Sequence, residues 1–221
     1  MKKTNNIANE ETFKDFQVAL DSFQPDLLEK KVTKPLEIYI YYTKIDKLYV
    51  WLKNAYNANL QSVENEMRAT LGHMSEYEQD RDNLQKAYGH IRRMGIDVLK
   101  ILCNGFDKEF EEWIITHAAF DYNSHDNLYM PQYVKMYNEA HNQYLYAQQK
   151  ENLGSNRNNN IIGEYYKAAE LYGVLYQYHL NGRREKIHKH YVVMIWQRRL
   201  WVLATSVVAV ISVIGYIISQ Q

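Results

Sequence analysis

The stretch LWVLATSVVAVISVIGYIISQQ, residues 200–221, contains no charged side chain and consists mainly of branched aliphatic residues. As a helix with a rise of about 1.5 Å per residue, it would extend about 33 Å and match a hydrocarbon core of about 30 Å. Trp201 and Tyr216 lie near its two ends, where amphipathic rings favour the membrane interface. The stretch therefore predicts a transmembrane helix over 200–218 and a short tail over 219–221. The alternative is a C-terminal helix buried in a protein core.

Small residues recur within this predicted span at spacings near three: Ala204, Ser206, Ala209, Ser212 and Gly215. Ala204, Ser212 and Gly215 are positions at which one helix backbone could approach another closely in lipid. The spacing predicts that several spans associate, so we expect a homo-oligomer.

Positive charge is concentrated immediately before the predicted span. Residues 183–199 contain six Lys or Arg and one Glu, a charge of +5, and the net charge of zero leaves −5 on the rest of the chain. Basic residues beside a span stay on the cytoplasmic side and are attracted to anionic lipid. The sequence therefore predicts a single-pass protein with a basic juxtamembrane helix over 183–199, most of the chain in the cytoplasm, and membrane lipid as a partner.

Cysteine usage and the N-terminal sequence argue against several other classes of protein. Cys103 is the single cysteine and lies in an apolar context, so the chain has neither a disulfide framework nor the Cys/His spacing of a metal site. Residues 1–11 lack the apolar run of a signal peptide. We expect no metal and no cofactor, and the sequence suggests no small-molecule substrate.

The chain before residue 183 follows helical periodicity, and β-branched alternation is nearly absent. We therefore predict an all-α fold, with a cytosolic helical bundle over 1–182. The expected helices cover 12–23, 35–71, 75–104, 106–119, 131–150 and 162–180, and a last helix runs from Arg183 into the span. Gly72 and Gly105 are interpreted as helix breaks, and Ser75 with Glu78 has capping-box spacing. The twenty tyrosines are expected to pack their rings inside the bundle with hydroxyls at its rim.

A polar stripe crosses the predicted helix 75–104. It consists of Lys86, His90, Arg93, Asp97 and Lys100, at intervals of four, three, four and three residues. At these intervals both Arg93 and Lys100 could reach Asp97 within the helix. The stripe is either a solvated face or, if partly buried, a structural element that specifies the fold or meets a charged partner helix. Because residues 94–103 are otherwise largely apolar, we expect this helix to be central.

The segment GRREKIHKH, residues 182–190, is the candidate catalytic stretch. On a helix Arg184 and His188 lie one turn apart, and Arg183 and His190 lie two turns apart on one face. Arginine can bind a phosphate and histidine can act as general acid or base, so such pairs could cleave RNA without a metal. A basic run before a membrane span explains the same residues.

These residues resemble the Arg-x4-6-His pattern of HEPN domains, which are all-α bundles of prokaryotic antiviral and toxin systems. Arg183 with His188, or Arg184 with His190, fits that pattern, and residues 85–100 look like the charged second helix of some HEPN-like families. The resemblance covers about 75–190. The candidate arginines are followed by Arg or Glu, where active members more often have Asn, Asp or His, and the motif lies close to the span.

A HEPN-like domain joined to a span is similar in layout to small membrane accessory proteins of type VI-B CRISPR systems. That resemblance implies a bacterial inner-membrane protein of antiviral defence, with RNA or an RNA-guided nuclease as a candidate partner. Three functions remain open: an oligomeric effector that perturbs membrane permeability, a membrane-tethered metal-independent ribonuclease, and a tail-anchored adaptor that docks a partner. We favour the effector because no strong catalytic constellation is present, and whether the protein is an enzyme stays open.

Overall fold

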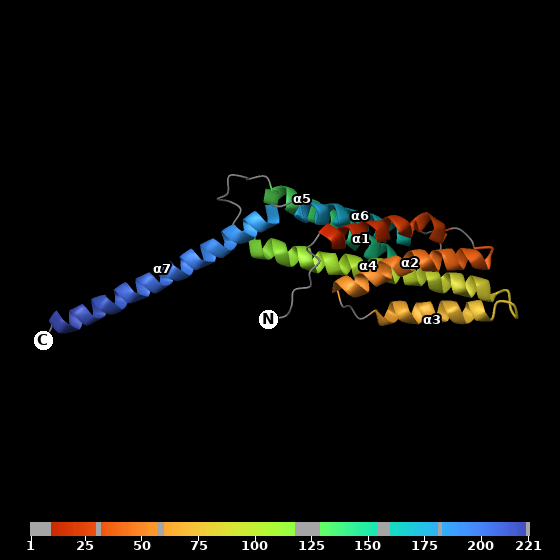
Figure 1. Cartoon of the computed structure of the whole chain (residues 1–221), viewed down its shortest axis with the longest axis horizontal. Helices are drawn as coiled ribbons and strands as arrows, with labels where there is room; N and C mark the ends of the chain where they lie inside the picture. The colour runs from red at the N-terminus through yellow and green to blue at the C-terminus, as the bar shows by residue number, and fades with distance from the viewer. Residues whose placement is uncertain are drawn as a thin grey trace.

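The computed structural model describes residues 10–29, 32–56, 60–117, 129–153, 160–180 and 183–219; side chains of 10, 27, 29, 183–188, 190, 211 and 213–219 lie outside this description. The described residues form seven α-helices and one short 3-10 helix, without strands, as the sequence predicts. These are α1 (Glu10–Phe23), η1 (Pro25–Glu29), α2 (Pro35–Tyr56), α3 (Gln61–Ser75), α4 (Asn83–His117), α5 (Tyr129–Asn152), α6 (Ile161–Leu180) and α7 (Arg183–Ser219). Figure 1 shows an elongated bundle of α1 to α6, with α7 extending from one end.

Helix α4 is the centre of the bundle, as the sequence predicts. It packs against α2, α3, α5 and α6. Its apolar residues Met94, Val98, Leu99, Leu102 and Phe106 are all fully buried. The core therefore forms around one helix that is apolar over most of its circumference.

Helices α1, α5 and α6 agree with the sequence prediction to within a few residues. Pro25 begins the 3-10 helix directly after α1, and Pro131 lies in the first turn of α5, where its missing N–H costs no hydrogen bond. The predicted face of α5 is buried throughout: it consists of Tyr133, Tyr137, Ala140, Tyr144 and Ala147. Asn181 and Gly182, which are typical of a helix C-cap, and residues 121–126, which are typical of a turn, lie outside the described residues.

Aromatic rings fill the core, but their hydroxyl groups are not confined to its rim. Tyr133, Tyr165 and Tyr172 are fully buried. Their hydroxyls bond to His179 at 3.0 Å, Glu151 at 2.6 Å and Asp107 at 2.7 Å, respectively. These three phenols are therefore satisfied by polar side chains of the bundle, and their rings lie deeper than the expectation from sequence placed them.

The predicted helix 35–71 is in fact two helices. α2 ends at Tyr56, and α3 begins at Gln61 and packs on α4 with Val63 and Thr70 buried. A single helix of 37 residues would be about 55 Å long, and its second half would leave Val63 without this contact. Asparagines at 54, 57 and 59 are the available sequence signal, since asparagine favours turns over helix interiors.

The next two predicted boundaries are also wrong. α3 continues through Gly72 to Ser75, whose hydroxyl donates to the Gly72 carbonyl oxygen at 2.7 Å, so Ser75 ends a helix and does not cap the start of one. α4 begins at Asn83 and runs without a break through Gly105 to His117. Gly105 serves packing: a Cβ there would lie 2.9 Å from Cζ of Tyr56.

We expect Gly105→Ala to destabilise the bundle although alanine is the better helix former by up to about 1 kcal/mol. The added methyl would displace the Tyr56 ring, which packs against Trp51 and Phe106. Gly89→Ala is the matched control, since Gly89 lies in the same helix and a Cβ added there would have no atom within 4 Å. Urea unfolding should rank Gly89→Ala at or above the parent protein and Gly105→Ala below it. Equal stabilities for the two variants would contradict this packing role.

Candidate functional site

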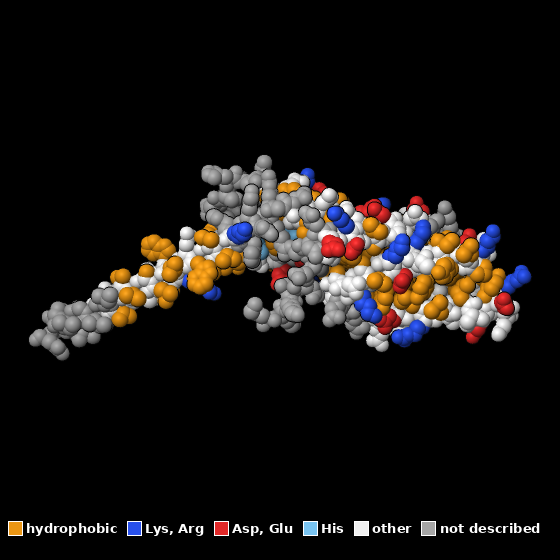
Figure 2. Space-filling model, viewed as in Figure 1, with side chains coloured by type: hydrophobic (Ala, Val, Ile, Leu, Met, Phe, Trp, Pro, Cys, Tyr) orange, Lys and Arg blue, Asp and Glu red, His pale blue; other side chains and the backbone are white. Residues whose placement is uncertain are grey.

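Helix α7 is the most unusual feature of the fold because it contributes no described residue to the hydrophobic core. The described side chains from Val192 to Val210 include a row of exposed apolar groups, among them Val193, Trp196 and Trp201 at 51%, 59% and 73% exposure. Figure 2 shows hydrophobic side chains along the described part of this helix. The alternative of a buried C-terminal core helix is therefore wrong for this segment.

By length and composition, α7 is the one described helix that could cross a membrane. The qualifying segment among the described residues is Tyr191–Val210, and none of it is buried. Arg198 and Arg199 lie in its middle, and an arginine at the bilayer centre costs about 2.5–3.5 kcal/mol on insertion scales. By composition, the charge-free sequence from Leu200 onward is therefore a better match to hydrocarbon than a segment centred on the two arginines.

The predicted assembly residues lie on this helix. Ala204 and Ser212 are exposed, and the Ser212 hydroxyl donates to the Val208 carbonyl oxygen at 2.8 Å. Such intrahelical bonds let a hydroxyl group enter lipid without losing its hydrogen bond. Gly215 belongs to the helical backbone of α7, in a part whose side chains are outside the description.

The predicted catalytic residues lie in the first turns of α7. Arg183, Arg184, His188 and His190 are all helical, and their side chains are outside the described residues. The structure consequently neither assembles nor separates these four side chains. The described residues contain no group of three or more His, Cys, Asp or Glu that could hold a metal ion.

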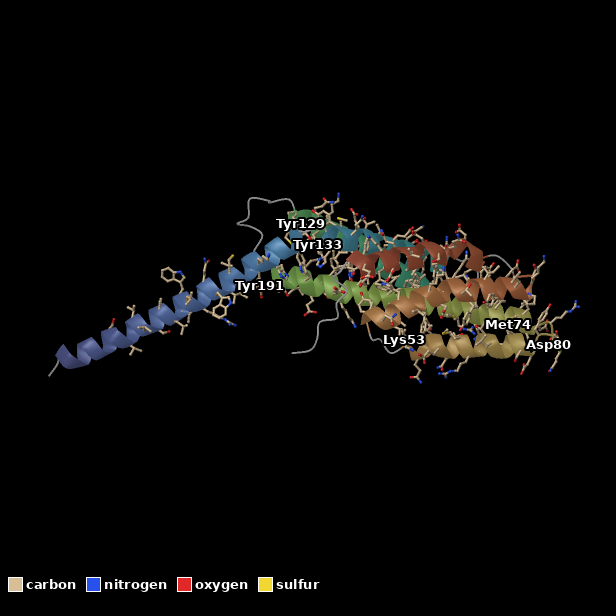
Figure 3. All side chains as sticks on the ribbon, viewed as in Figure 1. Lys53, Met74, Asp80, Tyr129, Tyr133 and Tyr191 are labelled. Atoms are coloured by element: carbon tan, nitrogen blue, oxygen red, sulfur yellow. The ribbon has the colours of Figure 1, made fainter. Side chains whose placement is uncertain are left out.

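The junction between the bundle and α7 is lined by aromatic rings. The Tyr191 ring lies 5.0 Å from the His117 ring, which in turn stacks on Trp113 at 4.6 Å. Figure 3 places Tyr129 and Tyr133 of α5 at the same end of the bundle as Tyr191. These contacts connect α7 to the end of α4, so the exposed helix begins on a well-packed part of the body.

The polar stripe of α4 meets a charged partner helix. Glu66 of α3 accepts hydrogen bonds from His90 Nδ1 at 2.6 Å and Arg93 Nε at 3.1 Å. Lys100 pairs with Glu151 of α5 at 3.0 Å. Helical spacing allows Arg93 and Lys100 to reach Asp97, but each forms its described ion pair with another helix.

The remaining members of the stripe are Lys86, at its N-terminal end, and Asp97, between Arg93 and Lys100. Lys86 pairs with Asp80 in the turn before α4 at 3.6 Å, and Figure 3 shows Asp80 at the end of the α3–α4 pair. Asp97 is half-buried opposite Ser62 of α3. Burial raises its pKa, against the opposing effects of Lys100 and the Ser62 hydroxyl.

We expect Asp97→Asn to be at least as stable as the parent protein near neutral pH. Because the pKa of Asp97 is raised on folding, the folded state holds this proton more tightly, and stability falls as pH rises through the interval between the unfolded and folded pKa values. Asparagine removes that cost. Thermal unfolding should show a larger difference between variant and parent at pH 7 than at pH 4, whereas the exposed control Glu78→Gln should show little difference at either. A variant that is less stable at pH 7 would instead give the larger role to attraction by Lys100.

A second polar cluster, which the sequence did not reveal, lies between α4, α5 and α6. The Asp107 carboxylate accepts hydrogen bonds from the Tyr172 hydroxyl and from His141 Nδ1, both at 2.7 Å. Burial, and then the charge and hydrogen bond of Asp107, raise the pKa of Tyr137 as well. We call Asp107, Tyr137, His141 and Tyr172 the Asp107 cluster. Because its side chains satisfy one another inside the bundle, we assign it a structural role.

Comparisons with protein-family models, with curated proteins and with solved structures found no match to this chain.

Proposed function

We propose that this protein is a membrane-anchored helical effector that assembles through α7 and alters the permeability of the bilayer. Its helical body lies in the cytoplasm beside the basic residues 183–199, and α7 crosses the membrane from about Leu200. On the resemblance to HEPN-like membrane accessory proteins, we propose prokaryotic antiviral defence as its setting, at the bacterial inner membrane.

The observation that carries this proposal is the exposure of α7. The hydrophobic core includes residues of α1 to α6 and no described residue of α7, so the body buries its apolar faces without this helix. Apolar exposure on this scale marks a membrane or protein interface. Trp201 beside two arginines, followed by a charge-free stretch, favours a lipid interface over a soluble partner.

Assembly and permeability follow from the composition of the span. In lipid no hydrophobic gain drives helix association, so small residues that allow close contact become important. Ala204 and Gly215 lie on nearly the same side of an ideal helix, since eleven residues make about three turns. A ring of helices that touch along such faces can enclose a pore, whereas an adaptor needs no association between spans.

Leucine substitutions test the proposal. Gly215→Leu and Ala204→Leu should weaken assembly and leave insertion intact, because both make the segment more apolar while blocking close contact. Val210→Leu, which enlarges a side chain on the other side of the helix, is the matched control. Chemical cross-linking in membranes measures assembly, and a potential-sensitive dye in expressing cells measures depolarisation.

The proposal expects cross-linking and depolarisation to fall together in the two variants and to persist in the control. His188→Ala with His190→Ala should leave depolarisation nearly unchanged. Loss of all cellular activity in this histidine variant, with full activity in the leucine variants, would overturn the proposal in favour of a ribonuclease.

A further inference from the structure

Four of the polar residues of α7 are spaced seven positions apart. Arg198, Thr205 and Ser212 are exposed on the helix, and Ser219 continues the series in the sequence. The chain contains no acidic residue after Glu185, so no carboxylate of α7 beyond that point can neutralise the arginines. Arg198 forms no ion pair or hydrogen bond with another residue whose side chain is described.

A seven-residue interval fixes the direction of this polar row in an assembly. On a straight helix such positions drift by only about 20° per heptad, so the three residues stay within about 40° of one another. Arg198, Thr205 and Ser212 then all face the same way along the span. The Arg198 guanidinium group is costly in hydrocarbon and favours water. The Thr205 and Ser212 hydroxyls donate to carbonyl oxygens of their own helix, so they are compatible with either surrounding and continue the row toward the middle of the span.

The proposed contact face lies to one side of this polar row. At about 100° per residue, Ala204 is roughly 100° around the helix from Thr205, and Gly215 is on the Ala204 side. Ser212, also predicted as an assembly residue, is about 80° from Ala204 and belongs to the polar row instead. In a ring of helices that touch side by side, one face of each helix is directed toward the centre of the ring. That face lies about a quarter turn from the contact face. The polar row therefore occupies the direction in which a pore would lie.

We infer that the pore formed by assembled α7 helices is lined by Arg198, Thr205 and Ser212 and that it conducts small inorganic anions in preference to cations. This inference rests on the proposed function. A ring of Arg198 guanidinium groups at the cytoplasmic mouth raises the local concentration of anions and repels cations, as rings of basic side chains do in anion pores. Arg199, one residue further, points about 100° away and lies outside the lining.

Reversal potentials test the selectivity. The full-length protein in planar bilayers under a potassium chloride gradient should reverse near the chloride equilibrium potential. Arg198→Glu should shift the reversal potential toward that of potassium, and Arg198→Gln should bring it closer to zero. Arg199→Glu is the matched control, because it makes the same charge change at nearly the same depth and should shift the potential far less.

Thiol labelling in liposomes tests the lining independently of conductance. Cys103 is fully buried and free, so it contributes little background. Thr205→Cys should react with a membrane-impermeant anionic methanethiosulfonate, and Ser206→Cys, the neighbour on a different face, should not. Equal labelling of both positions, or a conductance without anion preference, would overturn the inference and leave the proposed effector standing. Absence of any conductance, with assembly intact, would overturn both the inferred pore lining and the proposed effector function.

Discussion

Replacing Asp107 with alanine is expected to lower the free energy of unfolding of the helical body by about 3 kcal/mol, since each buried donor left without an acceptor costs about 1–3 kcal/mol. The Asp107 carboxylate accepts from Tyr172, which is fully buried, and it faces the Tyr137 hydroxyl. Alanine would leave both phenols without this acceptor and would also remove the partner of His141. Three helices lose a shared contact at once, so we expect cooperative destabilisation.

Urea unfolding, followed by circular dichroism, measures this effect. Lys108→Ala is the control, because Lys108 is the next residue of α4 and is exposed. Asp107→Asn, which keeps one carbonyl oxygen as an acceptor, should lie between the parent protein and Asp107→Ala. A loss of less than about 1 kcal/mol in the alanine variant would mean that water replaces the carboxylate, as it does for groups that solvent can reach.

The Asp107 cluster shows what a single sequence leaves undetermined. Asp107 follows Cys103 by four residues and precedes Phe110 by three, so helical spacing already places it beside the buried face of α4. That spacing does not identify the residues of other helices that contact Asp107. Tyr172 and His141 lie 65 and 34 residues away, and their approach depends on how α5 and α6 pack. The same reason explains why Glu66 and Glu151, and not Asp97, pair with the stripe.

Helix boundaries are hard to predict where glycine has two uses. Gly72 and Gly105 both have the sequence signature of a break, yet each lies inside a helix, one in open space and one against Tyr56. A glycine that allows a neighbouring ring to approach cannot be distinguished by sequence from one that ends a helix. The break that does occur, after Tyr56, contains no glycine or proline and is indicated only by asparagines.

The all-α class, the central position of α4 and the exposed C-terminal helix are predictable because each depends on local composition. Apolar periodicity decides whether a segment is helical, and a continuous apolar circumference decides whether it is covered on all sides. Helix α7 departs from this rule, because it is apolar and yet exposed, and this departure is informative about function. A helix this apolar has to be covered by something, and the bundle does not cover it.

Deleting residues 200–221 is therefore expected to move the protein almost completely from the membrane pellet to the soluble fraction while the body keeps its helical content. The truncated chain retains Tyr191 and its ring contact with His117, and it loses no residue of the described core. Fractionation measures location, and circular dichroism with thermal unfolding measures the body.

The informative comparison is with a longer deletion of 191–221. If the span begins near Leu200, both truncations are soluble, because Val192, Val193 and Trp196 alone bury too little apolar surface to hold the body at a bilayer. If the segment Tyr191–Val210 is the true hydrocarbon match, the chain ending at residue 199 keeps half of it, together with Arg198 and Arg199. A 1–199 protein that stays in the pellet while 1–190 is soluble would move the anchor toward Tyr191 and place both arginines within the bilayer.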